Sequence, residues 1–219
     1  MDLMIVFRGN TGETRFRRTR TRTAFERPGA LRLEGLAPFG APAFIFVAQL
    51  GEAVLLLPRD RKVVRNASAA NLLHALAGLA LDPEDVGALL TGCVVPDGVA
   101  VAARAYGEQW VAIDLEGGAS VYVKEIDNER LITIGTSGDL TVEYSEHIRG
   151  LPRHAQIQLG TGSSRTDLSV DLSQVTINTD FDSVVFAATV PEGFESITLD
   201  DLRRRSPTKE HAEDTQTSG

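Results

Sequence analysis

The feature that most constrains the fold is a regular succession of short apolar stretches separated by turn residues. Turn signals recur about every 8–12 residues over much of the chain, and apolar and polar side chains often alternate between them. The clearest alternation places Leu168, Val170 and Leu172 between polar neighbours. This spacing predicts a mainly β protein, a barrel or a sandwich, in which hairpins join antiparallel strands.

Two short helices are expected to interrupt the β pattern, near residues 68–78 and 83–91. Ser68 can cap the first helix, and Gly78 lies near its end. The sequence Asp82-Pro83-Glu84-Asp85 predicts the start of the second helix. It combines a capping acceptor, a proline in the first turn and acidic side chains at the positive end of the helix dipole. Both helices carry leucines, so we expect them to cover a sheet.

Length and composition predict one globular domain followed by a tail. The chain has 219 residues, of which 42% are hydrophobic, enough to bury about 70% of the unfolded surface. From Arg203 on, proline, serine, threonine and mixed charges leave little to pack. We therefore expect a single domain over residues 1–202 and a disordered tail over residues 203–219.

Charge and residue usage exclude several classes of function. The net charge of −8 argues against general nucleic-acid binding, which needs an excess of cations. The single cysteine, Cys93, excludes an intramolecular disulfide and a cysteine-rich zinc site. The four histidines are far apart and no acid–base constellation is recognisable. We therefore predict a protein that is not an enzyme and uses no metal or cofactor.

Three local features have ordinary structural interpretations. The segment of residues 160–164, GTGSS, looks like a phosphate loop, but no lysine or helix start follows it, which favours a hairpin. The segment of residues 90–93, LTGC, resembles the sequence before a lipidated cysteine, but its context favours a helix end with a buried thiol. His154 is interpreted as a solvent-facing strand residue rather than a base.

The start of the chain shows no secretory signal pattern, because no cationic region precedes the apolar residues that end at Phe7. Either the protein is cytoplasmic, or a segment that addresses it elsewhere lies outside this sequence. No apolar run approaches the roughly 20 residues of a membrane span.

An arginine-rich strand is expected near the N-terminus. Arginine and threonine alternate with each other along much of residues 15–23, which is typical of an exposed strand. One interpretation is a basic face that binds anionic lipid or phosphate. The other is an edge strand whose charges prevent aggregation.

Two further stretches, residues 43–47 and 54–57, are apolar on both faces of a strand. One face can line an ordinary core, while the other must contact helices, a partner or an apolar ligand. The two helices either simply cover this face or close a lipid pocket over it, and composition favours neither interpretation.

Three segments resemble the LolB family of outer-membrane lipoprotein receptors and, more broadly, LolA/LolB-type domains. Residues 31–40, LRLEGLAPFG, with the apolar strand that follows, resemble a strand–loop–strand of that family. Residues 79–92, LALDPEDVGALLTG, resemble its second helix, and residues 186–193, FAATVPEG, its final strand. In element order, the resemblance covers about residues 10–200.

The resemblance implies an unclosed, strongly curved antiparallel β-barrel with short α-helices forming a lid over an apolar cavity. In the family, this cavity accepts the acyl chains of a lipoprotein, and an apolar residue on an early loop helps deliver them to the membrane. It therefore implies a non-enzymatic carrier or receptor in lipoprotein localisation, in the periplasm or on the periplasmic face of the outer membrane. The partners implied are acylated lipoproteins or lipids, a periplasmic carrier protein and the outer-membrane surface. The alternative is an envelope-assembly or protein-interaction module whose own side chains fill the cavity.

The cavity wall is expected to combine one face of the early strands, the inner faces of both helices and two residues of the second half. The predicted lipid-binding residues are Leu31, Leu33, Phe44, Phe46, Leu55, Leu57, Leu72, Leu76, Leu89, Trp110 and Val142. Alternation does not decide which face of the strand is concave, so Ile45 and Val47 could line the cavity in place of Phe44 and Phe46. The predicted membrane-transfer loop is Pro38, Phe39 and Gly40. Phe39 is expected at an exposed tip, the alternative being a hairpin tip folded onto the core.

Overall fold

Over the residues that it describes, a computed structural model shows a single sheet of fourteen strands with three α-helices. The structure describes residues 2–11, 14–37, 39, 41–78, 80–95, 98–162 and 165–205, and their side chains from residue 19 to residue 204. No helix in these ranges combines the length and apolar character needed to cross a membrane.

The first half of the sheet consists of β1 (Asp2–Thr11), β2 (Thr14–Glu26), β3 (Ala30–Leu36), β4 (Phe44–Gln49), β5 (Glu52–Leu57) and β6 (Lys62–Val64). The second half consists of β7 (Ala100–Ala105), β8 (Trp110–Leu115), β9 (Ser120–Ile126), β10 (Glu129–Ser137), β11 (Leu140–Ser145), β12 (His154–Leu159), β13 (Thr166–Thr176) and β14 (Glu195–Ile197). The helices are α1 (Ala69–Ala77), α2 (Pro83–Thr91) and α3 (Leu199–Arg205), with 3-10 turns η1 (Glu116–Gly118) and η3 (Ser183–Phe186).

The sheet is open and almost wholly antiparallel. Its strand order is β14-β6-β5-β4-β3-β2-β1-β13-β12-β11-β10-β9-β8-β7, and only the short β14–β6 pairing is parallel. Within the described residues, the terminal strands β14 and β7 do not pair with each other, so the barrel stays unclosed. The mainly β, unclosed antiparallel fold predicted from the sequence is confirmed.

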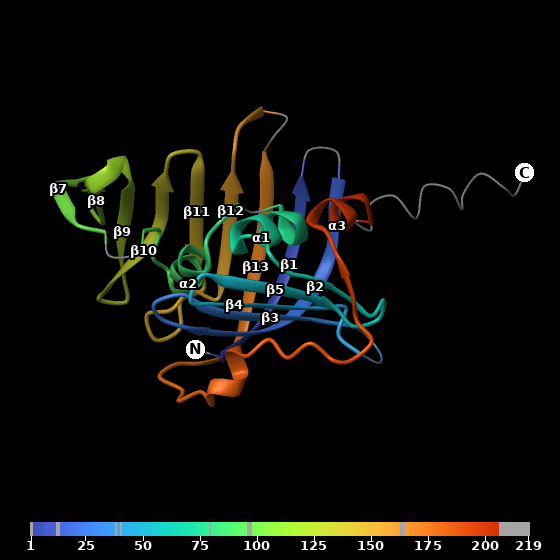
Figure 1. Ribbon diagram of the computed structural model, residues 1–219. Coiled ribbons are helices and arrows are strands. Elements are labelled where there is room, and N and C mark those ends of the chain that lie inside the picture. The colour runs from blue at the N-terminus through green and yellow to red at the C-terminus, as the bar shows by residue number, and fades with distance from the viewer. Residues whose placement is uncertain are drawn as a thin grey trace, which may run out of the picture.

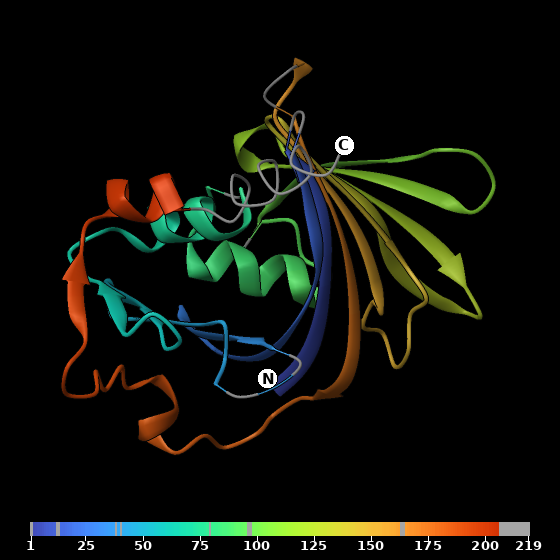
Figure 2. The ribbon, with the colours of Figure 1, turned by 90° about the vertical axis from the view of Figure 1, so that its right-hand side faces the viewer.

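The sheet curves around its helices. In Figure 1, β7 to β13, β1 and β2 stand side by side, while β3, β4 and β5 cross in front of them. The turned view of Figure 2 shows that the sheet bends, with α1 and α2 inside the bend. The two predicted helices therefore lie on the concave side, as expected.

Two apolar clusters fill the concave side. The early-strand cluster joins β2 to β6 with α1, β14 and α3, and its buried members are Phe25, Leu31, Leu33, Phe46, Ala48, Ala53, Leu55, Val64, Leu72, Leu73, Ile197 and Leu202. The late-strand cluster joins α2 to β9–β13, and its buried members are Leu89, Leu90, Val94, Val121, Leu140, Val142, Tyr144, Ala155, Ile157, Leu168, Val170 and Leu172. Val86 of α2 packs against both clusters, so α2 connects the two halves of the core.

The boundaries of α1 and α2 are set by the local signals that the sequence carries. The Ser68 hydroxyl accepts a hydrogen bond from the Asn71 backbone N–H at 3.2 Å. Gly78 and Gly92, which follow the two helices, have φ angles of 71° and 87°. These left-handed conformations favour glycine because it has no Cβ.

The helix end at Gly92 supports the structural interpretation of the segment before Cys93. The Cys93 backbone N–H donates to the Ala88 carbonyl at 2.8 Å, which closes α2. The expected burial of the thiol is wrong, however, because Cys93 is only half-buried. The segment after α2 turns toward the sheet through Val94, which takes the buried position instead.

The interpretation of the arginine-rich segment as an edge strand is wrong. Strand β2 lies between β1 and β3, in the middle of the sheet. Because side chains of a strand alternate between its faces, Thr21 and Thr23 are fully buried while Arg20 and Arg22 are exposed. The charge therefore lies on the outer face of an interior strand.

The outer face of the early strands is covered by residues 177–194, which we call the strap. Its turn η3 packs against β3 and β4. Phe186 is buried in a small cluster with Ala24 and Ala30, and its ring meets Phe181 edge-to-face at 5.3 Å. The strap helps explain why β4 is apolar on both faces: α1 and the early-strand cluster lie on one face, and η3 packs on the other.

After the strap, the chain closes with β14 and α3. Helix α3 brings Leu199 and Leu202 against the early-strand cluster and contacts α1. It runs to Arg205, so the predicted domain boundary at residue 202 falls within a helix. The rest of the predicted tail lies outside the described residues.

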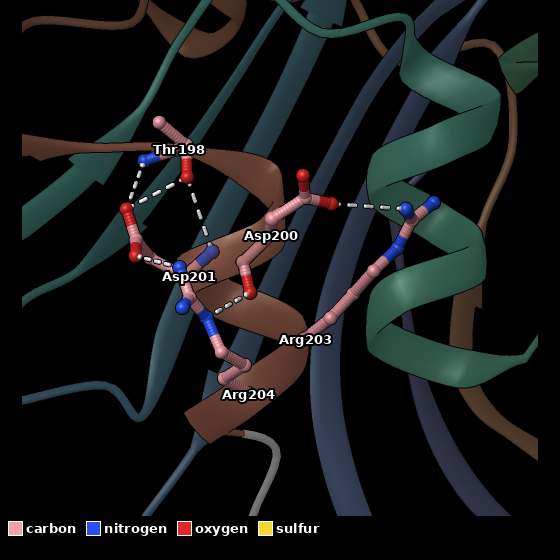
Figure 3. Close-up of polar contacts among 5 residues, drawn as sticks. All are labelled: Thr198, Asp200, Asp201, Arg203 and Arg204. Carbon is pink, nitrogen blue, oxygen red and sulfur yellow. Dashed lines mark hydrogen bonds and ion pairs between the residues drawn. The ribbon is translucent and has the colours of Figure 1, made fainter.

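A reciprocal cap holds the start of α3 (Figure 3). The Asp201 N–H donates to the Thr198 hydroxyl at 3.1 Å, while the Asp201 carboxylate accepts from the Thr198 N–H at 3.0 Å and from its hydroxyl at 2.7 Å. Arg204 pairs with the same carboxylate at 2.8 Å. The hydrogen bonds from the side chain and backbone of Thr198, assisted by Arg204, lower the pKa of Asp201.

We predict that Asp201→Ala loosens α3, because the variant loses an acceptor of two Thr198 hydrogen bonds. Faster amide hydrogen exchange in residues 199–205 would show the effect. In the unchanged protein, the lowered pKa means that this carboxylate stabilises α3 at pH values above its unfolded pKa. The contribution is lost as the pH falls through the lower, folded pKa. Asp200→Ala is the control, because the Asp200 carboxylate forms an exposed pair with Arg203 and its carbonyl contact with Arg204 is kept in the variant. Equal exchange in both variants would contradict the role of the cap.

Candidate functional site: the concave face and the early-strand loop

Most of the predicted lipid-binding residues meet in one place. Eight of the eleven belong to or pack against the early-strand cluster: Leu31, Leu33, Phe44, Phe46, Leu55, Leu57, Leu72 and Leu76. Leu89 and Val142 lie in the late-strand cluster. Trp110 lies apart from both, on β8.

The structure shows which face of β4 is concave, a point that the alternation of its residues does not decide. Phe46 is fully buried in the early-strand cluster, and Phe44 packs against it. Val47, also buried, lies instead near Phe186, where both line a groove of about 890 Å³ under the strap. The phenylalanine face is therefore the concave one.

In this structure, the predicted wall residues are packed as a core. Leu31, Phe46, Leu55 and Leu72 have no exposed surface. The pockets described here have volumes between about 420 and 890 Å³, and only Trp110 of the eleven residues lines one of them. At these four positions the concave face is therefore closed by packing within the early-strand cluster.

Two glycines let the α2 region approach the sheet closely. A Cβ on Gly87 of α2 would overlap the ring of Phe25 on β2. A Cβ on Gly135 of β10 would overlap Val94, just after α2. These contacts hold α2 firmly, whereas α1 packs mainly against β5 and α3.

The predicted transfer loop joins β3 to β4. The Phe39 side chain is 88% exposed, in agreement with the loop-tip interpretation. Arg59, in the β5–β6 turn, donates to the Phe39 carbonyl at 2.8 Å and so ties this loop to its neighbour. Pro38 and Gly40 lie outside the described residues. The loop thus presents an aromatic ring to solvent from an anchored backbone.

Trp110 belongs to a separate cleft of about 420 Å³ at the ends of β8 to β11. The Lys124 ammonium lies 5.3 Å from the centre of its ring, a cation–π contact. Tyr144, which also lines the cleft, donates its hydroxyl hydrogen bond to the Cys93 carbonyl at 3.4 Å. Burial raises the pKa of this phenol, so Tyr144 stays neutral. The structure does not bring Trp110 to the predicted wall.

The polar contact around His154 joins β12 to β13. His154 Nδ1 lies 2.8 Å from Asp171 Oδ1, and its Nε2 lies 3.2 Å from Gln156. His154 is thus half-buried and paired, rather than simply solvent-facing as expected. Among the described residues, no three His, Cys, Asp or Glu side chains are grouped so that they could hold a metal ion.

Sequence reasoning missed a polar contact between β3 and the strap. Arg32 holds Glu34 through two hydrogen bonds of 2.8 and 2.6 Å, and donates to the Val185 carbonyl at 3.0 Å. The sequence does indicate that Arg32 and Glu34 can pair, because residues two apart on a strand share a face. Nothing local indicated that the strap would lie over them.

Comparison with known proteins identifies the fold. No protein-family model and no curated protein sequence matches the chain. Among solved structures, a LolA superfamily protein from Nitrosomonas europaea aligns with a TM-score of 0.54 at 10% identity, covering 85% of this chain and 89% of that one. A DUF1329 family protein from Desulfovibrio piger gives 0.54 at 12% identity, with 85% and 88% covered. A putative outer membrane lipoprotein-sorting protein domain from Vibrio parahaemolyticus gives 0.51 at 10% identity, with 84% and 88% covered. The chain therefore has a LolA-type fold.

Proposed function

We propose that this protein is a non-enzymatic carrier or receptor that binds the acyl chains of lipoproteins or lipids on the concave face of its sheet. The observation that carries the proposal is the gathering of eight predicted wall residues between β3–β6 and α1 within a LolA-type fold. A role in lipoprotein localisation places it in the periplasm or at the periplasmic face of the outer membrane. Its partners there are acylated lipoproteins, that membrane surface and a periplasmic carrier protein.

Acyl binding on this face requires α1 to move away from β5. A nine-residue helix has little stability of its own in water, so its position depends on its apolar contacts. Each buried methylene contributes roughly 0.8 kcal/mol, so an acyl chain can replace the contacts that α1 gives up. No polar catalytic group is needed for this exchange.

The exposed aromatic of the β3–β4 loop supports a transfer role. Aromatic rings favour the interface between membrane and water, and Phe39 is free to enter it. Its strands β3 and β4 also carry Leu31, Leu33 and Phe46. A chain leaving the concave face would therefore pass close to the element that contacts the membrane.

A second candidate function is an envelope-assembly or protein-interaction module whose cavity is filled by its own side chains. The complete burial of Leu31, Phe46, Leu55 and Leu72 favours it. All residues of the terminal strand β7 are also exposed, and sheet edges of this kind can pair with other chains.

The two functions are separated by native mass spectrometry of the full chain after mild purification, followed by incubation with a synthetic triacylated lipopeptide. A carrier retains co-purified lipid or gains the mass of the lipopeptide at stoichiometric ratio. A deacylated peptide of the same sequence is the control and should not bind. Repeated absence of both bound species would favour the interaction module.

We predict that Leu76→Trp weakens lipopeptide binding by about tenfold while the melting temperature changes by only a few degrees. Leu76 is half-buried on α1 beside the early-strand cluster, so a larger ring would fill the space that an acyl chain needs. Fluorescence titration gives the affinity. Leu50→Trp, at a residue exposed in the β4–β5 turn, should leave it unchanged. If Leu76→Trp unfolds the protein, this face is ordinary core.

A further inference from the structure

An arginine on the outer face of β2 has no counter-ion among the residues that the structure describes. In the β2–β3 register, Arg22 lies directly opposite Glu34, an arrangement in which opposite charges usually pair. The Glu34 carboxylate is instead held by Arg32, at 2.6 and 2.8 Å. Within the described part of the chain, the Arg22 guanidinium makes no ion pair or hydrogen bond.

Arg22 lines a pocket of about 460 Å³ between the sheet and the strap. Its walls are Arg22, Ala24, Arg32, Glu34, Thr179, Phe181, Val184 and Val185. The Thr179 hydroxyl oxygen is also buried and has no hydrogen-bond partner among the described residues. A buried hydroxyl without a partner costs free energy, and a ligand oxygen would relieve that cost.

The rest of the pocket lining consists of the Arg32–Glu34 ion pair and an apolar surface, which is well supported. The Phe181 ring is fixed by its edge-to-face contact with the buried Phe186. Val184 is 62% exposed, at the turn η3. The Arg32 hydrogen bond to the Val185 carbonyl holds this part of the strap to β3. The pocket therefore combines the Arg32–Glu34 ion pair and an apolar surface with a cation and a hydroxyl that have no partner among the described residues.

Nearby carboxylates do not neutralise Arg22. Glu34 is occupied by Arg32, and the Asp182 carboxylate accepts the Val184 N–H at 3.1 Å, which caps η3. Asp180, on the strap, is exposed and does not line the pocket. Arg20, two residues from Arg22 on the same face of β2, adds a second exposed cation. Because β2 is an interior strand, these arginines are not needed to protect a sheet edge.

We propose that this outer pocket binds the phosphate headgroup of an anionic amphiphile. The Arg22 guanidinium and the Thr179 hydroxyl donate to phosphate oxygens, and the first carbons of the tail lie on Phe181 and Val184. Charge-assisted hydrogen bonds from arginine to phosphate are among the strongest available to a protein. The site goes beyond the proposed function, because it uses the opposite face of the strands from the acyl-binding cluster.

The test measures binding of dodecyl phosphate, below its micelle concentration, by isothermal titration calorimetry to the full chain. Arg22→Gln should weaken binding at least about tenfold, since it removes the charge. Arg20→Gln is the matched control and should stay within about twofold, because Arg20 does not line the pocket. Both arginines are exposed, so neither variant should change the melting temperature.

Further measurements distinguish an amphiphile phosphate from free phosphate as the ligand. They also distinguish binding on the outer face of the sheet from binding on the concave face. Val184→Ser should weaken dodecyl phosphate but not inorganic phosphate; if inorganic phosphate binds as tightly as dodecyl phosphate, the site is for free phosphate. Leu76→Trp should leave dodecyl phosphate binding unchanged. If Leu76→Trp abolishes it and Arg22→Gln does not, the probe binds the concave face, which overturns the outer site and leaves the proposed function intact. Absence of dodecyl phosphate binding also overturns the outer site.

Discussion

Phe39→Glu should slow the transfer of a bound lipopeptide to liposomes by about 10- to 100-fold, while folding and lipopeptide affinity stay at their original values. Moving a phenylalanine side chain from water into an apolar layer gains roughly 1.5–3 kcal/mol, which corresponds to this range of rates. A carboxylate resists entering the layer. Because Phe39 is 88% exposed, its loss removes little packing from the folded protein. Stopped-flow fluorescence with labelled lipopeptide and labelled liposomes measures the rate.

The matched control is Leu50→Glu. Leu50 is 93% exposed, in the turn at the other end of β4, so the substitution adds the same charge away from the β3–β4 loop. Transfer should be unchanged. A large fall in the melting temperature of Phe39→Glu would show that Phe39 is buried in solution, and unchanged transfer would make the loop a plain turn. Either result removes the membrane role of this loop.

Phe46→Ala should lower the free energy of unfolding by about 3–5 kcal/mol, as is typical when a fully buried phenylalanine is truncated. The ring lies at the centre of the early-strand cluster, where the cavity left behind cannot readily collapse between β5 and α1. Urea unfolding monitored by circular dichroism gives the value. Val101→Ala on the exposed strand β7 should change it by no more than about 0.5 kcal/mol.

The size of this effect tests the closed packing from which the proposed lipid binding would have to start. A loss in the predicted range means that the concave face is dry and closed without ligand, so acyl chains must displace α1. A loss below about 1.5 kcal/mol would contradict the packing of Phe46 seen here. It would indicate a cluster that is already open in solution.

The two proposed sites use opposite faces of the same early strands. On the concave face, leucines and phenylalanines meet the helices, and on the outer face, Arg22 and Arg32 meet the strap. In the two proposals, the concave site would recognise the chains of an amphiphile and the outer site its charged group. The cap of α3 and the Arg32–Val185 hydrogen bond fix the segments that border these sites.

Several features could be predicted from the sequence because their causes are local. The caps at Ser68 and Asp82 and the glycines that end α1 and α2 marked both helices to within one residue. The alternation around Leu168 placed β13 and its buried face. The exposure of Phe39 followed from the turn residues around it. The mainly β fold and eight clustered wall residues could be predicted for the same reason, since alternation decides which side chains share one face of a strand.

Features that depend on distant segments were decided only by the tertiary structure. Strand β1 pairs with β13, where Ile5 lies opposite Leu172, and this pairing places β2 inside the sheet rather than at its edge. Packing of α1 against β5 made the wall residues a closed core and left Trp110 in another cleft. The strap, which begins more than a hundred residues after β5, covered the outer face and set Thr179 beside Arg22. The residues of a strand determine how its side chains alternate and which of its faces is apolar. Its backbone groups, however, form the same hydrogen bonds with any neighbouring strand. Which strand pairs with it, and what lies over each face, is therefore decided by the packing of the whole chain.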